Sequence, residues 1–162
     1  MLALGARWFC YVSVRDLDLK IEGFGLWVEN YAYSDVEDYW DGNWVNVLAC
    51  CEFPGARVKA SGALVHLSEI AAFAVQCKLL YEEKAPIACL PCMEPNLLIE
   101  LRKIDKLGHI AASISLTPDH LHQTHSFEFE IDQSYLPGIV ASCDSIISRF
   151  PIRGMNPEGK QA

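Results

Sequence analysis

The sequence has 162 residues, of which 51% are hydrophobic and 21% are charged, and its formal net charge at pH 7 is −8. This length suits one domain with its own hydrophobic core, and the composition excludes an intrinsically disordered chain. A general nucleic-acid binder needs an excess of Lys and Arg to contact phosphates. Because the sequence contains 13 Lys and Arg but 21 Asp and Glu, we expect no nucleic-acid partner.

The N-terminal segment is apolar but does not have the features of a signal peptide. Residues 1–14 read MLALGARWFCYVSV, with Arg7 in the middle and no small-residue cleavage site after the apolar run. We expect a strand or an irregular leader here. No run of 18 apolar residues predicts a transmembrane helix. We therefore expect no membrane partner and a cytoplasmic location.

Strands joined by turns are predicted next. Leu17–Phe24 alternates apolar and charged residues, and a second apolar stretch, LWVEN, follows at 26–30. After an acidic, aromatic loop, WVNVLACCEF at 44–53 predicts a strand. One face of this strand should contain Val45, Val47, Ala49, Cys51 and Phe53. PGA at 54–56 predicts the turn into a paired strand.

A first amphipathic helix is predicted at about 67–84. Ser68 is expected to cap it, and Glu69 lies where the helix dipole favours a carboxylate. Pro86 cannot continue the helix. Apolar residues recur at helical spacing and should form one apolar stripe: Ile70, Phe73, Ala74, Cys77, Leu80 and Tyr81.

The second half predicts more strands and a second helix. PIACLPCMEP at 86–95 is interrupted by prolines, which suits an edge strand or a bulge. NLLIELRKI, IAASISLTP and HSFEFEID follow as strands. A helix is predicted at about 133–150, with Asp132 or Ser134 as its cap and Pro137 in its first turn. Its buried stripe should consist of Leu136, Ile139, Val140, Cys143, Ile146, Ile147 and Phe150.

Strands joined by short turns are antiparallel, because a parallel pair needs a long crossover. The sequence therefore predicts an α+β fold. It should be a single domain at 1–154, mainly an antiparallel β-sheet with the two helices packed on one face. Residues 155–162 are expected to form a polar tail.

Two groups of residues are candidates for a metal site. Cys89 and Cys92 form a CxxC, and His120 and His122 would share a face of an extended chain. One CxxC supplies only half of a structural zinc site, and the strand-like MEPNLLIEL after it is not the helix that a redox CxxC requires. Metal binding stays an alternative that depends on the fold. We expect seven reduced cysteines and no cofactor.

The acidic loop is the main candidate for binding another protein. Counted from Asp35, the sixth position, where a calcium loop requires Gly, is Trp40. Carboxylates beside aromatic side chains are instead a typical interface composition. We predict a partner-binding surface at Asp35, Glu37, Asp38, Trp40 and Asp41, with a plain solvated loop as the alternative.

Motifs of enzymes are absent from the sequence. G-x-S-x-G, Walker A and G-x-G-x-x-G do not occur, and we expect no catalytic residues. A small enzyme with an unfamiliar site is the remaining alternative. It would need a deep pocket lined by His109, or by the cluster from His120 to His125 together with Asp119.

Four segments taken in order resemble the WapI-type immunity proteins, from about Leu17 to Gly154. These segments are DGNWVNV (Asp41–Val47), MEPNLLIEL (Met93–Leu101), FEFEIDQSYL (Phe127–Leu136) and RFPIRG (Arg149–Gly154). The resemblance implies a small cytoplasmic bacterial protein that binds and neutralises the toxic C-terminal domain of a contact-dependent polymorphic toxin, which cleaves tRNA in the founding case. It implies no catalytic residues. The apolar N-terminus, the CLPC and the many cysteines depart from the family, and leave the cognate toxin open.

Overall fold

The computed structural model describes residues 16–157, which form two four-stranded antiparallel sheets and two helices. The first sheet contains β1 (Leu19–Ile21), β2 (Phe24–Tyr31), β3 (Trp44–Phe53) and β4 (Ala56–His66), in that order. The second contains β5 (Ile87–Pro91), β6 (Leu97–Lys103), β7 (His109–Leu116) and β8 (Ser126–Asp132). Helix α1 (Leu67–Tyr81) connects the sheets, and α2 (Tyr135–Arg149) follows β8.

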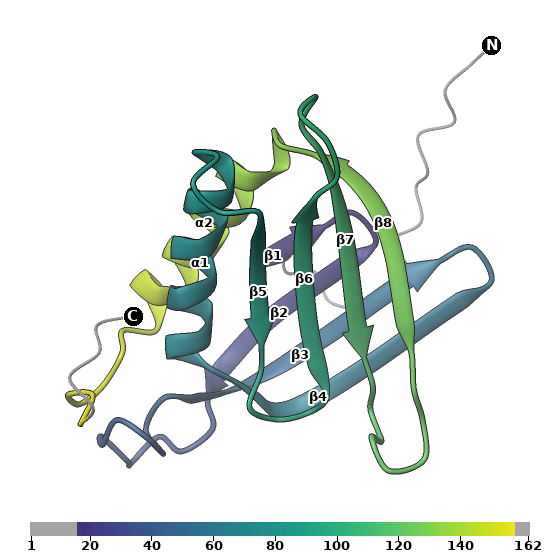
Figure 1. Ribbon diagram of the computed structural model, residues 1–162. Helices are drawn as coiled ribbons and strands as arrows, with labels where there is room; N and C mark the ends of the chain where they lie inside the picture. The colour runs from purple at the N-terminus through teal and green to yellow at the C-terminus, as the bar shows by residue number, and fades with distance from the viewer. Residues whose placement is uncertain (1–15, 158–162) are drawn as a thin grey trace.

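The main core lies between the two sheets. Figure 1 shows the second sheet in front of the first, with the strands of the two sheets running in different directions. Successive side chains of a strand point to opposite faces, and the inward faces are fully apolar. On β3 and β7 the most deeply buried side chains are Val45, Val47, Ala49, Cys51, Ala112, Ile114 and Leu116.

The two helices lie together along one side of the sheets (Figure 1). Helix α1 packs against α2 and β5, and α2 also packs against β1. An ion pair of 2.7 Å between Arg149 and Asp18 ties the end of α2 to the start of β1. The α+β class, the antiparallel strands and the two helices are confirmed. The strands, however, form two sheets rather than one.

Three local predictions are confirmed only in part. The predicted strand at 17–24 is broken by a turn, where Glu22 has a positive φ of 47° and separates β1 from β2. Phe53 lies on the predicted face of β3, where it contacts Phe129 of the second sheet with ring centroids 5.6 Å apart, but it is 46% exposed at the end of the hairpin. Tyr81, the last residue of α1, is 48% exposed, whereas the other residues of the predicted stripe are buried.

No helix among residues 16–157 is both long and apolar enough to span a membrane. The prediction for the N-terminal segment, residues 1–15, lies outside the described residues.

Candidate partner-binding surface

The acidic loop, residues 32–43, connects β2 to β3 and is held by one arginine from the other end of the chain. Nη1 of Arg153 donates hydrogen bonds to three of its carbonyl oxygens: Tyr33 at 3.2 Å, Ser34 at 3.2 Å and Val36 at 2.8 Å. The same guanidinium stacks on the ring of Tyr31, 3.5 Å from the centroid. The charge of Arg153 is therefore used to shape the loop backbone.

Asn43 closes the loop from the opposite side. Its side chain has no exposed surface, and its Nδ2 donates to the carbonyl oxygens of Tyr39 at 2.7 Å and Arg153 at 2.8 Å. Its Oδ1 accepts a hydrogen bond of 2.7 Å from the backbone N–H of Arg153. The whole amide is thus satisfied, as a buried polar group requires.

Gly154 lets the C-terminal segment approach the loop. Its φ is +67°, a conformation that side chains disfavour. A Cβ at this position would lie 2.7 Å from the backbone N of Tyr39 and 3.0 Å from the backbone C of Asp38. The segment after α2 therefore packs backbone against backbone with the acidic loop.

His66 lies beneath the loop and also caps α1. Its Nε2 is 3.0 Å from the carbonyl oxygen of Tyr39 and 3.2 Å from that of Trp40, so Nε2 carries the proton that it donates. Its Nδ1 then accepts from the backbone N–H of Ser68, at 3.3 Å. The expected cap at Ser68 was wrong, because His66 precedes the helix and takes the N-cap position.

Glu69 extends this anchor to the connection between β5 and β6. One carboxylate oxygen accepts from the backbone N–H of His66 at 2.9 Å, which completes a capping box. The other accepts from the backbone N–H of Met93 at 2.7 Å. Burial raises the pKa of Glu69 above its ordinary value, although these hydrogen bonds act to lower it. The acidic loop, the start of α1 and the segment before β6 therefore form one connected unit.

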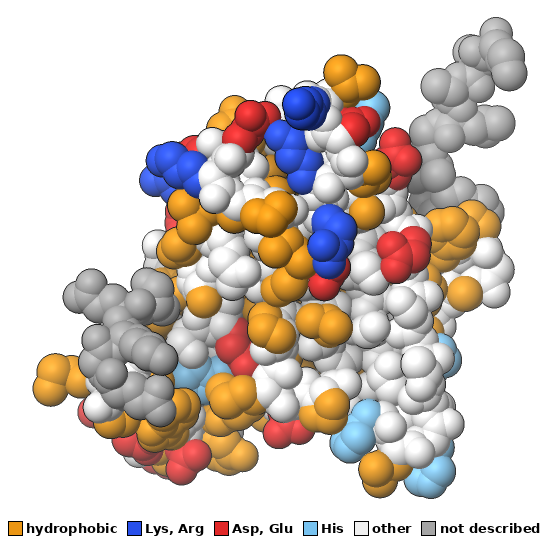
Figure 2. Space-filling view, viewed as in Figure 1, with side chains coloured by type: hydrophobic (Ala, Val, Ile, Leu, Met, Phe, Trp, Pro, Cys, Tyr) orange, Lys and Arg blue, Asp and Glu red, His pale blue; other side chains and the backbone are white. Residues whose placement is uncertain are grey.

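The outer surface of this unit is acidic and aromatic. The five predicted residues, Asp35, Glu37, Asp38, Trp40 and Asp41, are all exposed, and the exposed fraction of Trp40 is 45%. Asp38 accepts from the backbone N–H groups of Trp40 at 2.8 Å and Asp41 at 2.9 Å. Acidic and hydrophobic side chains gather at this end of the molecule in Figure 2, whereas Lys and Arg gather toward the opposite end, where α1 and β6 end.

Comparison with protein families gives a match that covers most of the chain. The model of the Immunity protein WapI-like family matches residues 17–151. The chain belongs to this family. No curated protein matches the chain. Two of the segments that resemble the family, DGNWVNV and RFPIRG, contact each other in this WapI-like protein. Hydrogen bonds join Asn43 in the first to Arg153 in the second, 110 residues later in the chain.

The fold of this WapI-like protein does not bring the metal-site candidates Cys89 and Cys92 together with His120 and His122. No three His, Cys, Asp or Glu side chains lie close enough together to hold a metal ion among residues 16–157. Cys89 lies on the edge strand β5, whereas His120 and His122 lie in the β7–β8 connection, where His122 contacts Asp119 at 2.8 Å. Burial raises the pKa values of both Cys89 and Cys92, the opposite of a reactive thiolate.

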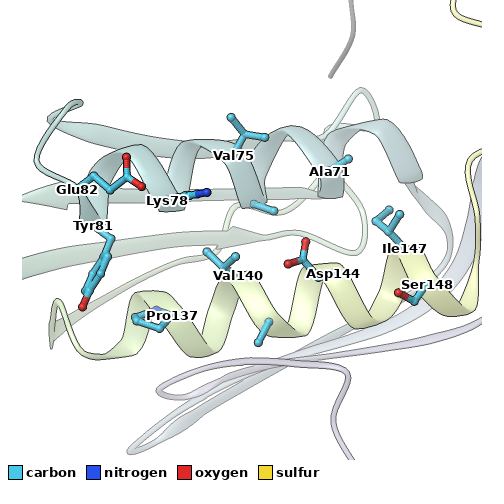
Figure 3. Close-up of a pocket in the computed structure, with 12 residues that line it drawn as sticks. Ala71, Val75, Lys78, Tyr81, Glu82, Pro137, Val140, Asp144, Ile147 and Ser148 are labelled. Carbon is cyan, nitrogen blue, oxygen red and sulfur yellow. The ribbon is translucent and has the colours of Figure 1, made fainter.

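Two hollows among residues 16–157 contain neither His109 nor the cluster from His120 to His125 in their linings, which the alternative enzyme site would require. The larger one, about 870 Å³, lies between α1 and α2 and has no His in its lining (Figure 3). His109 instead forms an ion pair of 2.6 Å with Asp105, which raises the pKa of His109 and lowers that of Asp105.

The anchoring residues His66, Asn43 and Arg153 were missed by sequence reasoning. The spacing of His66 and Glu69 matches a capping box, but His occupies the place where Ser or Thr is usual. Asn43 and Arg153 carry no local signal, because their partners are distant in the chain.

Proposed function

We propose that this protein binds the toxic domain of a cognate polymorphic toxin with one-to-one stoichiometry, and neutralises it in the cytoplasm. Membership of the immunity family supports a protective role. The main support for a binding surface is the structure of the acidic loop. Hydrogen bonds from Arg153 and His66 hold its backbone, and its outer side exposes four carboxylates and Trp40.

The charge of the loop suits a basic toxin domain, such as a nuclease. The loop contains Asp35, Glu37, Asp38 and Asp41 and no Lys or Arg, and the nearby charge of Arg153 is directed at backbone carbonyls. Complementary charges accelerate association and select against other partners. Trp40 and Tyr33, which are 45% and 51% exposed, supply aromatic contact area beside the charges.

The anchoring of the loop favours tight binding. Ordering a flexible loop during association opposes binding. Here the three bonds from Arg153, the amide of Asn43 and the ring of His66 hold the backbone before a partner arrives. The carboxylates are therefore presented on a preorganised surface.

Growth rescue tests the function directly. Co-expression with the toxin domain encoded beside this protein should restore growth, and purified proteins should form a one-to-one complex by calorimetry. Toxicity that persists while soluble protein is present would disprove the proposal.

A matched pair of double variants tests the surface. Glu37→Gln/Asp41→Asn should slow association at low salt, by about tenfold, and the difference should shrink at high salt. Glu128→Gln/Glu130→Gln removes the same charge from exposed positions of β8 and should leave association unchanged. Equal effects of the two double variants would contradict a binding surface on the acidic loop.

A further inference from the structure

Helix α1 carries apolar side chains around its whole circumference. Its predicted stripe is buried except at Tyr81, and Val75 and Leu79 on its other side are 48% and 37% exposed. Ala71 and Ala72, in the turn before, are also partly exposed. A helix that is apolar all round is normally covered on all sides. The outer side of α1 therefore has the composition of a surface that another protein covers.

This surface continues into a groove between the two helices. The groove has a volume of about 870 Å³, and the helices run antiparallel along it (Figure 3). Its lining includes the small residues Ala71, Ala74 and Ala141, flanked by the larger Val75 and Val140. Small side chains let a further helix approach closely, since the side chains at a contact set the distance between helix axes.

The charges in the groove decide between possible occupants. Lys78 lies on the α1 wall and Asp144 on the α2 wall (Figure 3), and neither forms an ion pair with any of residues 16–157. A uniformly basic or acidic partner would meet a like charge on one wall. Glu82 also lines the groove, but its carboxylate is paired with Lys84 at 2.7 Å. Of the two remaining charges, a second copy of the same surface presents one of each sign, in exchanged order. A two-fold axis that passes between the two residues places each Lys78 opposite the Asp144 of the other copy.

We propose that the α1/α2 groove is the interface of a homodimer, in which two copies pack their helix pairs together around this axis. The acidic loop contributes no residue to the lining of the groove. Each subunit would thus keep its loop free for its own partner, and the dimer does not depend on the proposed toxin binding.

Sedimentation equilibrium of the full chain over a range of concentrations tests the dimer. The wild-type protein should show a monomer–dimer equilibrium, and Val75→Glu should be monomeric. Lys78→Glu and Asp144→Lys should each weaken the dimer about tenfold, because each places like charges opposite one another. The double variant Lys78→Glu/Asp144→Lys should restore it, because both charges are exchanged. Lys106→Glu, an exposed position in the β6–β7 turn, is the control for the change in net charge.

Circular dichroism and thermal unfolding should show that each variant is folded. We expect this because Val75 and Lys78 are exposed, so their substitution does not disturb the core. The proposal is overturned if the wild-type protein is monomeric at every concentration, or if the dimer tolerates Val75→Glu and both single charge changes. It is also overturned if the protein is monomeric and Val75→Glu abolishes toxin binding, because the groove would then belong to the toxin.

Discussion

Asn43 and Arg153 are 110 residues apart in the chain, yet each fixes the position of the other. The backbone N–H of Arg153 donates to Oδ1 of Asn43 at 2.7 Å, and Nδ2 of Asn43 donates to the carbonyl oxygen of Arg153 at 2.8 Å. The side chain of Arg153 then reaches three carbonyl oxygens of the acidic loop. The position of the loop therefore depends on the segment that follows α2.

Asn43→Ala should destabilise the protein strongly. It removes three hydrogen bonds and leaves the half-buried N–H and carbonyl groups of Arg153 without a partner, while the carbonyl of Tyr39 keeps only its bond from His66. We expect the free energy of unfolding to fall by about 2–4 kcal/mol, measured by urea denaturation. Asn46→Ala is the control, because its single side-chain bond, to Asn30, is exposed. A loss there as large as at Asn43 would contradict this account of the anchor.

Two Gly→Ala substitutions should have opposite effects on stability. Gly154→Ala should lower the free energy of unfolding by about 1–3 kcal/mol, since φ is +67° and the new Cβ meets the backbone of Tyr39. Gly138→Ala lies in the first turn of α2, where a Cβ meets nothing within 4 Å. It should raise stability by about 0.5–1 kcal/mol. Thermal unfolding of both variants gives the signs, and a stabilising Gly154→Ala would show that the C-terminal segment is not packed as described.

Glu69 should make a pH-dependent contribution to stability. Because burial raises its pKa in the folded state, the folded protein binds the proton more tightly than the unfolded chain. This contribution is fully present below the ordinary value of 4.5 and is lost as pH rises through the raised pKa.

Glu69→Gln isolates this effect. The variant cannot titrate here, so the free energy of unfolding of the wild-type protein minus that of the variant should decrease as pH rises from about 4. Urea denaturation of both proteins at several pH values measures the difference, and other carboxylates cancel in it. A difference that grows with pH would mean that the hydrogen bonds from His66 and Met93 outweigh burial.

Trp40→Ala should weaken binding of the toxin domain, and this prediction rests on the proposed function. A large aromatic side chain at the centre of an interface commonly contributes about 2 kcal/mol or more, which is roughly a thirtyfold change in Kd. Leu107→Ala is a control of greater exposure, at 83% against 45%, in the turn between β6 and β7. Calorimetry should show the loss for Trp40 alone.

The sequence contained the information for the elements themselves. Period-two alternation in Phe127, Phe129 and Ile131 predicts a strand that the structure contains as β8, and the helical spacing from Ile70 to Leu80 predicts α1. The exposure of the acidic residues at 35–41 also follows from their composition. These features depend on neighbours within a few positions, and such neighbours determine which face of an element is apolar.

Only the tertiary structure decided which strands and side chains contact one another. Periodicity shows that a strand has a buried face, but not which sheet covers it. The division of the eight strands within residues 16–157 into two sheets could therefore not be predicted. The same reason applies to the site: the ring of His66 lies under Tyr39 and Trp40, and Arg153 stacks on Tyr31. These partners are far apart in sequence, and their hydrogen bonds form only after the core has brought the two ends of the chain together.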